Sequence, residues 1–310
     1  MKQHPVLIIA GPTASGKSAL AIAAARELNG VVLNCDSMQI YKDIPIIAAT
    51  PSVQEKTQAE HCLFELYDAS KRGNVVEWLD LCVAEIKKLW AEKRLPVVVA
   101  GTGMYIAALI NDITPSPEVV PAVRENLRQR LQNEGLVRLY VELKQKDEEI
   151  AAKLNPNDKT RIVRALEIIE TTGKKVSQWY QVPLIKKLPE ADFITVKIVP
   201  PIATIEERCR ERLDKMVAAG ALDEIAGLLQ RGIDATLPAM KALGVPELSL
   251  AVKGEMLLSE ALELAKLHTR QYAKRQRTWL KNKLPADIVF DGVYAGQTEY
   301  LSKIKEVYTA

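Results

Sequence analysis

The sequence has few of the residues that hold zinc sites or small secreted domains together. Its 310 residues include four cysteines and three histidines, and no two cysteines form a Cys-x-x-Cys pair or stand near paired histidines. These spacings match neither a zinc site nor a disulfide framework. We therefore expect reduced thiols, which are typical of a cytosolic protein.

Long apolar runs are also absent. No apolar stretch approaches the roughly 18 residues that a membrane-spanning helix needs, and the N-terminus lacks the layout of a signal peptide. The formal net charge is only +3, so a nucleic acid would have to be bound by local basic patches and not by a global field. We expect a cytoplasmic protein of one large or two moderate domains, with no membrane segment.

The sequence does contain a strong anion-binding motif near its N-terminus. Gly11 to Ser18 reads Gly-Pro-Thr-Ala-Ser-Gly-Lys-Ser and fits the pattern Gly-x4-Gly-Lys-Ser/Thr, between an apolar run and a helix-forming run. The glycines let successive N–H groups point inward at the positive end of a helix dipole. Lys17 can reach an outer phosphate, and the Ser18 hydroxyl is placed to hold Mg²⁺. The motif predicts a phosphate or diphosphate ligand, with a ligand-free turn as the alternative.

Two further apolar runs, Val31 to Asn34 and Leu95 to Ala100, are typical of buried parallel strands, and polar residues follow each. Asp36 follows the first run, and Thr102 follows the second between two glycines. Because ligands of open α/β sheets bind beyond the carboxyl ends of the strands, both residues should face the phosphate loop. Asp36 can take a proton, help to hold the metal or cap a helix. Thr102 can hydrogen-bond a phosphate or a base, or belong to a plain turn.

The middle of the chain changes character after a break at Thr114 to Pro117. The residues from there to about Tyr180 are helical and charged, and a strand-like run begins at Phe193. The predicted fold class is therefore α/β, with a P-loop NTPase-like parallel sheet core. We assign residues 1–114 and 193–310 to this core and residues 115–192 to an inserted helical domain.

Basic residues gather in two predicted helices. Arg161 and Arg164 stand three residues apart, on one face of a helix in the insertion. The last long helix has a basic residue every three or four positions and no acid from Lys266 to Lys283: Lys266, Arg270, Lys274, Arg277 and Lys281. Such a stripe fits a nucleic-acid backbone, and a solvated surface is the alternative for both groups.

Six of these segments, taken in order, resemble the motifs of bacterial tRNA dimethylallyltransferases. They are Gly11 to Ser18, Asp36 to Tyr41, Gly101 to Tyr105, Asn157-Asp158 with Arg161 to Arg164, Lys241 to Gly244, and Arg270 to Trp279. The resemblance runs from residue 6 to about 284. It implies a P-loop kinase-like core and the transfer of a dimethylallyl group from its diphosphate to N6 of the adenosine on the 3′ side of the tRNA anticodon.

The resemblance also implies roles for individual residues. Asp36 matches the general base, Thr102 the hydroxyl at the diphosphate end of the donor, and Lys17 a cation that stabilises the departing diphosphate. The implied diphosphate site comprises Gly11, Pro12, Thr13, Ala14, Ser15, Gly16, Lys17, Ser18 and Arg208, with Mg²⁺ held by Ser18. The implied tRNA-binding set comprises Asp36, Ser37, Met38, Gln39, Thr102, Arg124, Thr160, Arg161, Ile162, Val163, Arg164, Lys274 and Arg277. The expected partners are the anticodon stem-loop of tRNA and dimethylallyl diphosphate, and the expected assembly is a monomer.

The sequence departs from the family pattern at three places. Ala100 replaces a glycine, Ile47 to Pro51 replaces a Gly-Thr-Ala-Lys-Pro stretch, and Ile202 stands where many members have an arginine. The last departure leaves Arg208 and Arg212 as the nearby candidates for phosphate contact. We expect altered detail without loss of activity.

Two other classes of protein remain as alternatives. A small-molecule or nucleotide kinase would use the same loop, with Asp36 as the base for an acceptor hydroxyl. An RNA-binding P-loop module without catalysis would explain the basic helix. The basic helix argues against the kinase, and the polar residues at the strand ends argue against the pure binding module.

Overall fold

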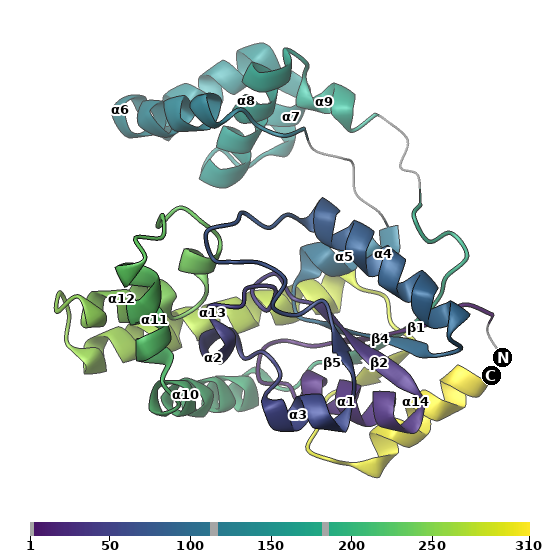
Figure 1. Cartoon of the computed structure of the whole chain (residues 1–310). Coiled ribbons are helices and arrows are strands. Elements are labelled where there is room, and N and C mark those ends of the chain that lie inside the picture. Colours follow the sequence, from purple (N-terminus) through teal and green to yellow (C-terminus); the bar gives the residue numbers. More distant parts are fainter. Residues whose placement is uncertain (1–2, 112–116, 182–185) are drawn as a thin grey trace. The chain divides into compact units, whose positions relative to one another are not determined.

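The computed structural model describes residues 3–111, 117–181 and 186–310 (Figure 1). The chain divides into two compact units, one of residues 1–111 and 187–310 and one of residues 112–186. The expected break at 114–117 and the boundary at 114–115 fall in or beside 112–116, which lies outside the described residues. No helix in the described ranges is both long enough and apolar enough to span a bilayer.

The larger unit is built on a parallel sheet with the strand order β3-β2-β4-β1-β5-β6, which confirms the predicted α/β class. The strands are β1 (Pro5–Ala10), β2 (Gly30–Cys35), β3 (His61–Cys62), β4 (Leu95–Ala100), β5 (Asp192–Ile198) and β6 (Ile288–Phe290). Ala100 pairs with Ala10 on one side and with Cys35 on the other. The central strands β2, β4 and β1 therefore end level, and the segments that follow them meet at one edge of the sheet.

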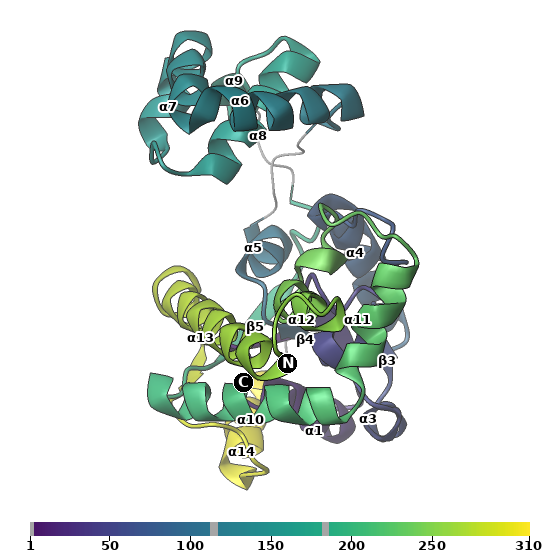
Figure 2. The same ribbon diagram turned by 90° about the vertical axis from the view of Figure 1, so that its left-hand side faces the viewer.

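Helices cover both faces of this sheet (Figures 1 and 2). On one face lie α1 (Lys17–Glu27) and α14 (Thr298–Thr309), whose buried residues join the apolar core under the sheet. On the other lie α4 (Val75–Ala91) and α5 (Gly103–Asn111). Trp78 of α4 is fully buried and donates a hydrogen bond from Nε1 to the carbonyl of Asn34 at 2.9 Å, which fixes the end of β2.

The remaining helices of the larger unit surround the edge where the strands end. They are α2 (Pro45–Ala48), α3 (Val53–Gln58), α10 (Ile202–Ala218), α11 (Ala221–Gln230), the 3₁₀ helix η1 (Ala239–Lys241), α12 (Val245–Val252) and α13 (Leu258–Lys283). Lys197 of β5 is buried and donates hydrogen bonds from Nζ to the carbonyls of Leu280 and Leu284, at 3.3 and 2.7 Å. These bonds satisfy carbonyls at the C-terminus of α13 and fasten this helix to the sheet.

The smaller unit is helical throughout its described part. It contains α6 (Pro121–Lys146), α7 (Glu148–Lys153), α8 (Lys159–Thr172) and α9 (Val176–Trp179). Leu139 and Leu143 of α6 pack with Ile162 and Leu166 of α8 in an apolar core of its own. The long helix α6 bends at Gly135, whose φ of 79° and ψ of 165° are not helical.

Candidate active site

The phosphate loop, residues 11–18, leads from the end of β1 into α1. Gly16 has a φ of 86°, and a Cβ on it would lie 2.3 Å from the carbonyl oxygen of Tyr294. A Cβ on Gly11 would lie 2.4 Å from Oγ of Ser15. The loop therefore needs glycine at both positions, because a side chain would collide with atoms packed against it.

Only part of this loop is free to bind an anion through its N–H groups. Three N–H groups already have acceptors within the protein: Gly11 donates to the Ala100 carbonyl at 3.2 Å, Ser15 to the Pro12 carbonyl at 3.3 Å, and Thr13 to Oε1 of Gln276 at 2.9 Å. Among residues 11–18, all of which the structure describes, the N–H groups without an acceptor within the protein are those of Ala14, Gly16, Lys17 and Ser18. The free donors are thus fewer than the predicted site of residues 11–18, and three of the four lie at the N-terminus of α1.

Asp36 lies beyond the end of β2, beside the phosphate loop. The buried side chain of Asn34 shapes this turn: its Oδ1 accepts the N–H of Asp36 at 2.9 Å, and its Nδ2 donates to the carbonyls of Asp36 and Leu63, both at 3.1 Å. Oδ1 of Asp36 accepts the N–H of Met38 at 2.9 Å. The other carboxylate oxygen faces Gly101, where a Cβ would come within 2.7 Å of it. One oxygen is thus held by the backbone, and the other is turned toward the strand ends.

Thr102 follows β4 and contacts the segment that follows β2. Its Oγ1 accepts the N–H of Ser37 at 3.2 Å and lies 3.4 Å from Oγ of Ser37. Lys17 also reaches this place, because its Cε lies 3.4 Å from the Cβ position of Gly101. The structure therefore brings together Asp36, Thr102 and Lys17, as the strand pattern predicts.

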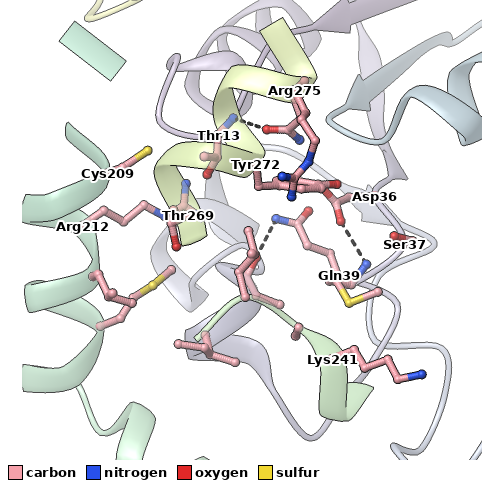
Figure 3. A pocket seen from close by; sticks show the side chains of 18 of the residues that line it. Thr13, Asp36, Ser37, Gln39, Cys209, Arg212, Lys241, Thr269, Tyr272 and Arg275 are labelled. Carbon is pink, nitrogen blue, oxygen red and sulfur yellow. Dashed lines mark hydrogen bonds between the residues drawn. The ribbon is translucent and has the colours of Figure 1, made fainter. Parts of the chain in front are cut away.

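A cavity of about 310 Å³ opens beside these residues (Figure 3). Asp36, Ser37 and Gln39 line one side, and Arg212 and Cys209 of α10 lie across from them (Figure 3). Part of the lining is apolar: Ile47, Ala48, Leu213, Met216, Ala242 and Leu243. A second cavity of about 410 Å³ adjoins the phosphate loop and shares Lys17, Gln39 and Arg212 with the first. Cationic, acidic and apolar side chains thus line the first cavity together.

The cations at the phosphate loop are partly removed from water. Burial lowers the pKa of Lys17 to about 8; the carboxylate of Asp36 opposes this shift and the guanidinium of Arg212 adds to it. Burial also lowers the pKa of Arg212. Arg208 is exposed and donates from Nε to the carbonyl of Ala14 at 2.9 Å, so it braces the loop and lines the second cavity. A bound anion would stabilise the charged forms of Lys17 and Arg212, because it would replace the hydration that these cations lose on burial.

The loop also fits a divalent cation that is carried by a diphosphate. Within the described ranges, no group of three or more His, Cys, Asp or Glu side chains is arranged to hold a metal by itself. Ser18 stands in the first turn of α1 and lines the second cavity, next to the free N–H groups. Mg²⁺ prefers oxygen ligands and commonly shares them between one or two protein groups and phosphates. Its other ligands would then be diphosphate oxygens and water.

The predicted RNA contacts of the smaller unit fall into two groups. Glu167 bridges Arg124 and Arg164, at 3.3 and 3.1 Å, so these arginines are engaged within the unit. Thr160 is exposed, and the side chain of Arg161 is 73% exposed at 3.4 Å from Asp158. The interpretation of Ile162 as an RNA contact needs correction, because its side chain is fully buried. Val163 is partly buried and packs against the same core.

The basic stripe of α13 is shorter than the sequence predicts. Lys266 pairs with Asp214 of α10 at 2.8 Å, and Arg270 pairs with Glu206 of α10 at 3.0 Å. Arg277 is partly buried and donates from Nε to the carbonyl of Pro200 at 2.9 Å. Among the residues that the structure describes, no acid pairs with Lys274, Arg275 or Lys281. The uncompensated charge therefore lies in the C-terminal half of the helix.

The inner face of α13 carries three side chains that are not among the predicted site residues. Tyr272 lines the cavity beside Asp36 (Figure 3), and burial together with that carboxylate raises the pKa of Tyr272. Gln276 is buried and reaches the phosphate loop, and Trp279 packs against Gly103, where a Cβ would lie 2.6 Å from its ring. Positions 272, 276 and 279 are four and three residues apart, so these side chains lie on one face of the helix. This helical spacing was the sequence feature that could have identified them as a shared inner face.

The strand order, the glycine-dependent loop and the polar residues beyond adjacent strands define a P-loop NTPase-like protein. A family model described as IPP transferase matches residues 39–283, and one described as isopentenyl transferase matches residues 4–67. The chain belongs to the IPP transferase family.

Similar proteins include two curated bacterial relatives, both named tRNA dimethylallyltransferase. The one from Rhodospirillum rubrum is 43% identical, over 92% of this chain and 87% of the relative, and the one from Zymomonas mobilis is 42% identical, over 91% and 89%. The crystal structure of a tRNA isopentenylpyrophosphate transferase from Bacillus halodurans has a TM-score of 0.70 at 30% identity, over 99% of this chain and 96% of that one. A eukaryotic dimethylallyltransferase acting on tRNA has a TM-score of 0.78 at 30% identity, over 99% and 78%.

Proposed function

We propose that this protein transfers a dimethylallyl group from dimethylallyl diphosphate to N6 of the adenosine on the 3′ side of the tRNA anticodon, with release of diphosphate. One observation carries the proposal: the carboxylate of Asp36 and the cations of Lys17 and Arg212 line the same cavity. A base for an amine and a site for a diphosphate are thus available to the two ends of one reaction. The names of the relatives support the same activity.

The diphosphate end of the donor is assigned to the second half of the phosphate loop. The free N–H groups there, with Lys17 and Arg212, would stabilise the charge that gathers as the allylic C–O bond breaks. A divalent ion, for which we propose Mg²⁺ at Ser18, supplies further charge stabilisation when it is bound. Oγ1 of Thr102 accepts the N–H of Ser37, a bond that does not use the hydroxyl proton, so this proton can be donated to a diphosphate oxygen.

Asp36 is assigned as the general base. The N6 amino group of adenine is a weak nucleophile because its lone pair is delocalised into the ring. A proton must therefore leave nitrogen as the C–N bond forms, and a carboxylate oxygen at the amine can accept it. The bond to Met38 holds one oxygen of Asp36 and leaves the other for this task.

The RNA is assigned to exposed basic surfaces of the two units. Lys274, Arg275 and Lys281 of α13 would contact the backbone, and Arg275 also lines the cavity. Arg161, with Thr160, is the exposed candidate in the smaller unit. The target base cannot be reached while it is stacked, so we propose that it is flipped toward Asp36. Because one chain supplies every proposed catalytic group, we propose a monomer, acting on tRNA in the cytoplasm.

A two-substrate assay tests this function against the kinase alternative. Purified protein is incubated with an unmodified anticodon stem-loop RNA and either prenyl-labelled dimethylallyl diphosphate or γ-phosphate-labelled ATP. We expect label in the RNA from the first donor and none from the second. A stem-loop with guanosine in place of the target adenosine is the control and should stay unlabelled. Transfer of label from ATP, or labelling of the control RNA, would contradict the proposal.

A further inference from the structure

Gln276 touches both of the segments that carry the proposed chemistry. Its side chain is only 8% exposed, although it sits in the middle of a helix with a basic outer face. Oε1 accepts the N–H of Thr13 at 2.9 Å, and Nε2 donates to the carbonyl of Gly101 at 2.7 Å. The dashed line at Thr13 in Figure 3 marks the first of these bonds. One amide thus uses its oxygen on the phosphate loop and its nitrogen on the end of β4.

The bond from Gln276 to Gly101 lies next to the side chains of Asp36 and Lys17. The Cβ position of Gly101 lies 2.7 Å from Oδ2 of Asp36, 3.4 Å from Cε of Lys17 and 3.4 Å from Nε2 of Gln276. Gly101 also precedes Thr102 in the chain. A shift of this short segment would therefore move the proposed base, the cation and the hydroxyl relative to one another.

The bond to Thr13 also affects the phosphate loop itself. It occupies an N–H group that would otherwise be free to bind an anion, and so it leaves as free donors only Ala14 and the residues that begin α1. The pairing of β1 with β4 brings the two bridged segments side by side as far as Ala10 and Ala100, and Gly11 donates to the Ala100 carbonyl. Beyond the strand ends, the amide of Gln276 links Thr13 to Gly101, from a helix that is fastened to β5 through Lys197.

We propose that Gln276 is a positioning residue for prenyl transfer. It acts through Thr13 and Gly101: it fixes which N–H groups of the loop receive the diphosphate and holds Asp36 and Thr102 in register with them. This inference rests on the function proposed above. A misplacement of about 1 Å in such a site lowers the rate by about 100-fold.

Two variants separate positioning from simple structural support. Gln276→Leu removes both hydrogen bonds at similar side-chain volume, and we expect kcat to fall about 10- to 100-fold with the KM for RNA unchanged. Gln276→Glu keeps an acceptor for Thr13 but directs a carboxylate oxygen at the Gly101 carbonyl until the carboxyl group is protonated. Burial raises the pKa of a carboxyl group, so protonation restores both bonds in an accessible range. The ratio of the kcat of Gln276→Glu to that of the wild type should therefore rise as pH falls.

The controls keep this test separate from the test of function. Gln230→Leu changes an exposed glutamine of α11 and should leave kcat unchanged. The Kd for inorganic pyrophosphate, measured by calorimetry, should rise for Gln276→Leu whether or not prenyl transfer occurs. If the wild type transfers no prenyl group, the proposed function fails. If the wild type is active and folded Gln276→Leu matches it, the positioning role fails. If Gln276→Leu does not fold, a pH-independent ratio for Gln276→Glu overturns the role.

Discussion

The buried side-chain amide of Asn34 fixes the backbone of Asp36, the proposed general base. Asn34 is fully buried, and its side chain holds the backbone of Asp36 from both sides, as acceptor of the N–H and donor to the carbonyl. The carboxylate therefore needs little reorganisation when a substrate arrives, and such preorganisation is a large part of catalysis. The polar groups around Asp36 would thus serve the proposed chemistry as well as the turn.

Asp36→Asn tests the base directly. Asparagine has the same shape and can still accept the N–H of Met38 through its oxygen, but it cannot take a proton. We expect kcat to fall by about 10²- to 10⁴-fold, with the Kd values for stem-loop RNA and pyrophosphate unchanged. Single-turnover assays and binding titrations provide these values. A parallel loss of RNA binding and of rate would instead make Asp36 a structural residue.

Lys17 provides a prediction about pH. Its pKa of about 8 in the free protein lies below the usual 10.5, so it is mostly neutral above pH 8, whereas a bound anion favours the charged form. Binding of pyrophosphate should therefore take up a proton and weaken as pH rises from about 8 toward 10. By the same linkage, the contribution of Lys17 to folding stability rises over this range, because the unfolded chain binds the extra proton.

Calorimetry in buffers of different ionisation enthalpy measures this proton uptake. Lys17→Met is the control, since it keeps the titration of pyrophosphate and removes that of the lysine. We expect the wild type to take up more protons per pyrophosphate than Lys17→Met above pH 8. Equal uptake by the two proteins would show that Lys17 is already charged in the free site.

Some individual site residues could be predicted from the sequence, and others could not. Lys17 could be predicted from the Gly-x4-Gly-Lys-Ser motif. Asp36 and Thr102 could be predicted because each lies just beyond a buried strand, and parallel strands end at a common edge. The bond from Gln276 to Thr13 could not be predicted, because it joins positions 263 residues apart. No periodicity or motif reports such a contact.

At the scale of elements, α13 has two faces with different tasks. Its inner face contributes Tyr272 and Gln276 to the site, and its outer face bears the basic residues. The sequence predicts the helix and its charge because both follow from spacing within one element. It could not reveal that Asp214 and Glu206 of α10 neutralise the N-terminal half, since those acids come from a different helix.

A pair of matched lysine variants on α13 tests this division. Lys274→Gln removes an exposed charge without an acidic partner among the described residues, and Lys266→Gln removes one that is paired with Asp214 and Glu263. We expect Lys274→Gln to weaken stem-loop binding and to reduce the slope of log Kd against log salt by about 1. Lys266→Gln should leave the slope nearly unchanged. Equal slopes for the two variants would mean that α13 faces solvent.

In the whole molecule, the sheet and the smaller unit differ in how much of their structure the sequence predicts. The buried apolar runs of β1, β2, β4 and β5 made the fold class predictable, whereas the strand order β3-β2-β4-β1-β5-β6 was not predicted, because apolar runs do not show which strands pair. The smaller unit could be predicted as helical from its charged, periodic sequence. Its internal ion pairs could not be predicted: the sequence indicates Arg124 and Arg164 as candidates for RNA contact but does not reveal that Glu167 bridges them. Charged helices show which residues are polar, but not which of them are already paired.

We propose that one molecule of this protein couples departure of a diphosphate to deprotonation of an adenine amine. A single reaction in which both products are counted tests this coupling: pyrophosphate released and N6-prenylated adenosine formed in a stem-loop RNA. We expect one pyrophosphate for each modified adenosine, with both products lost together in Asp36→Asn. Formation of inorganic phosphate in place of pyrophosphate, or a prenyl group on any other atom of the RNA, would contradict it.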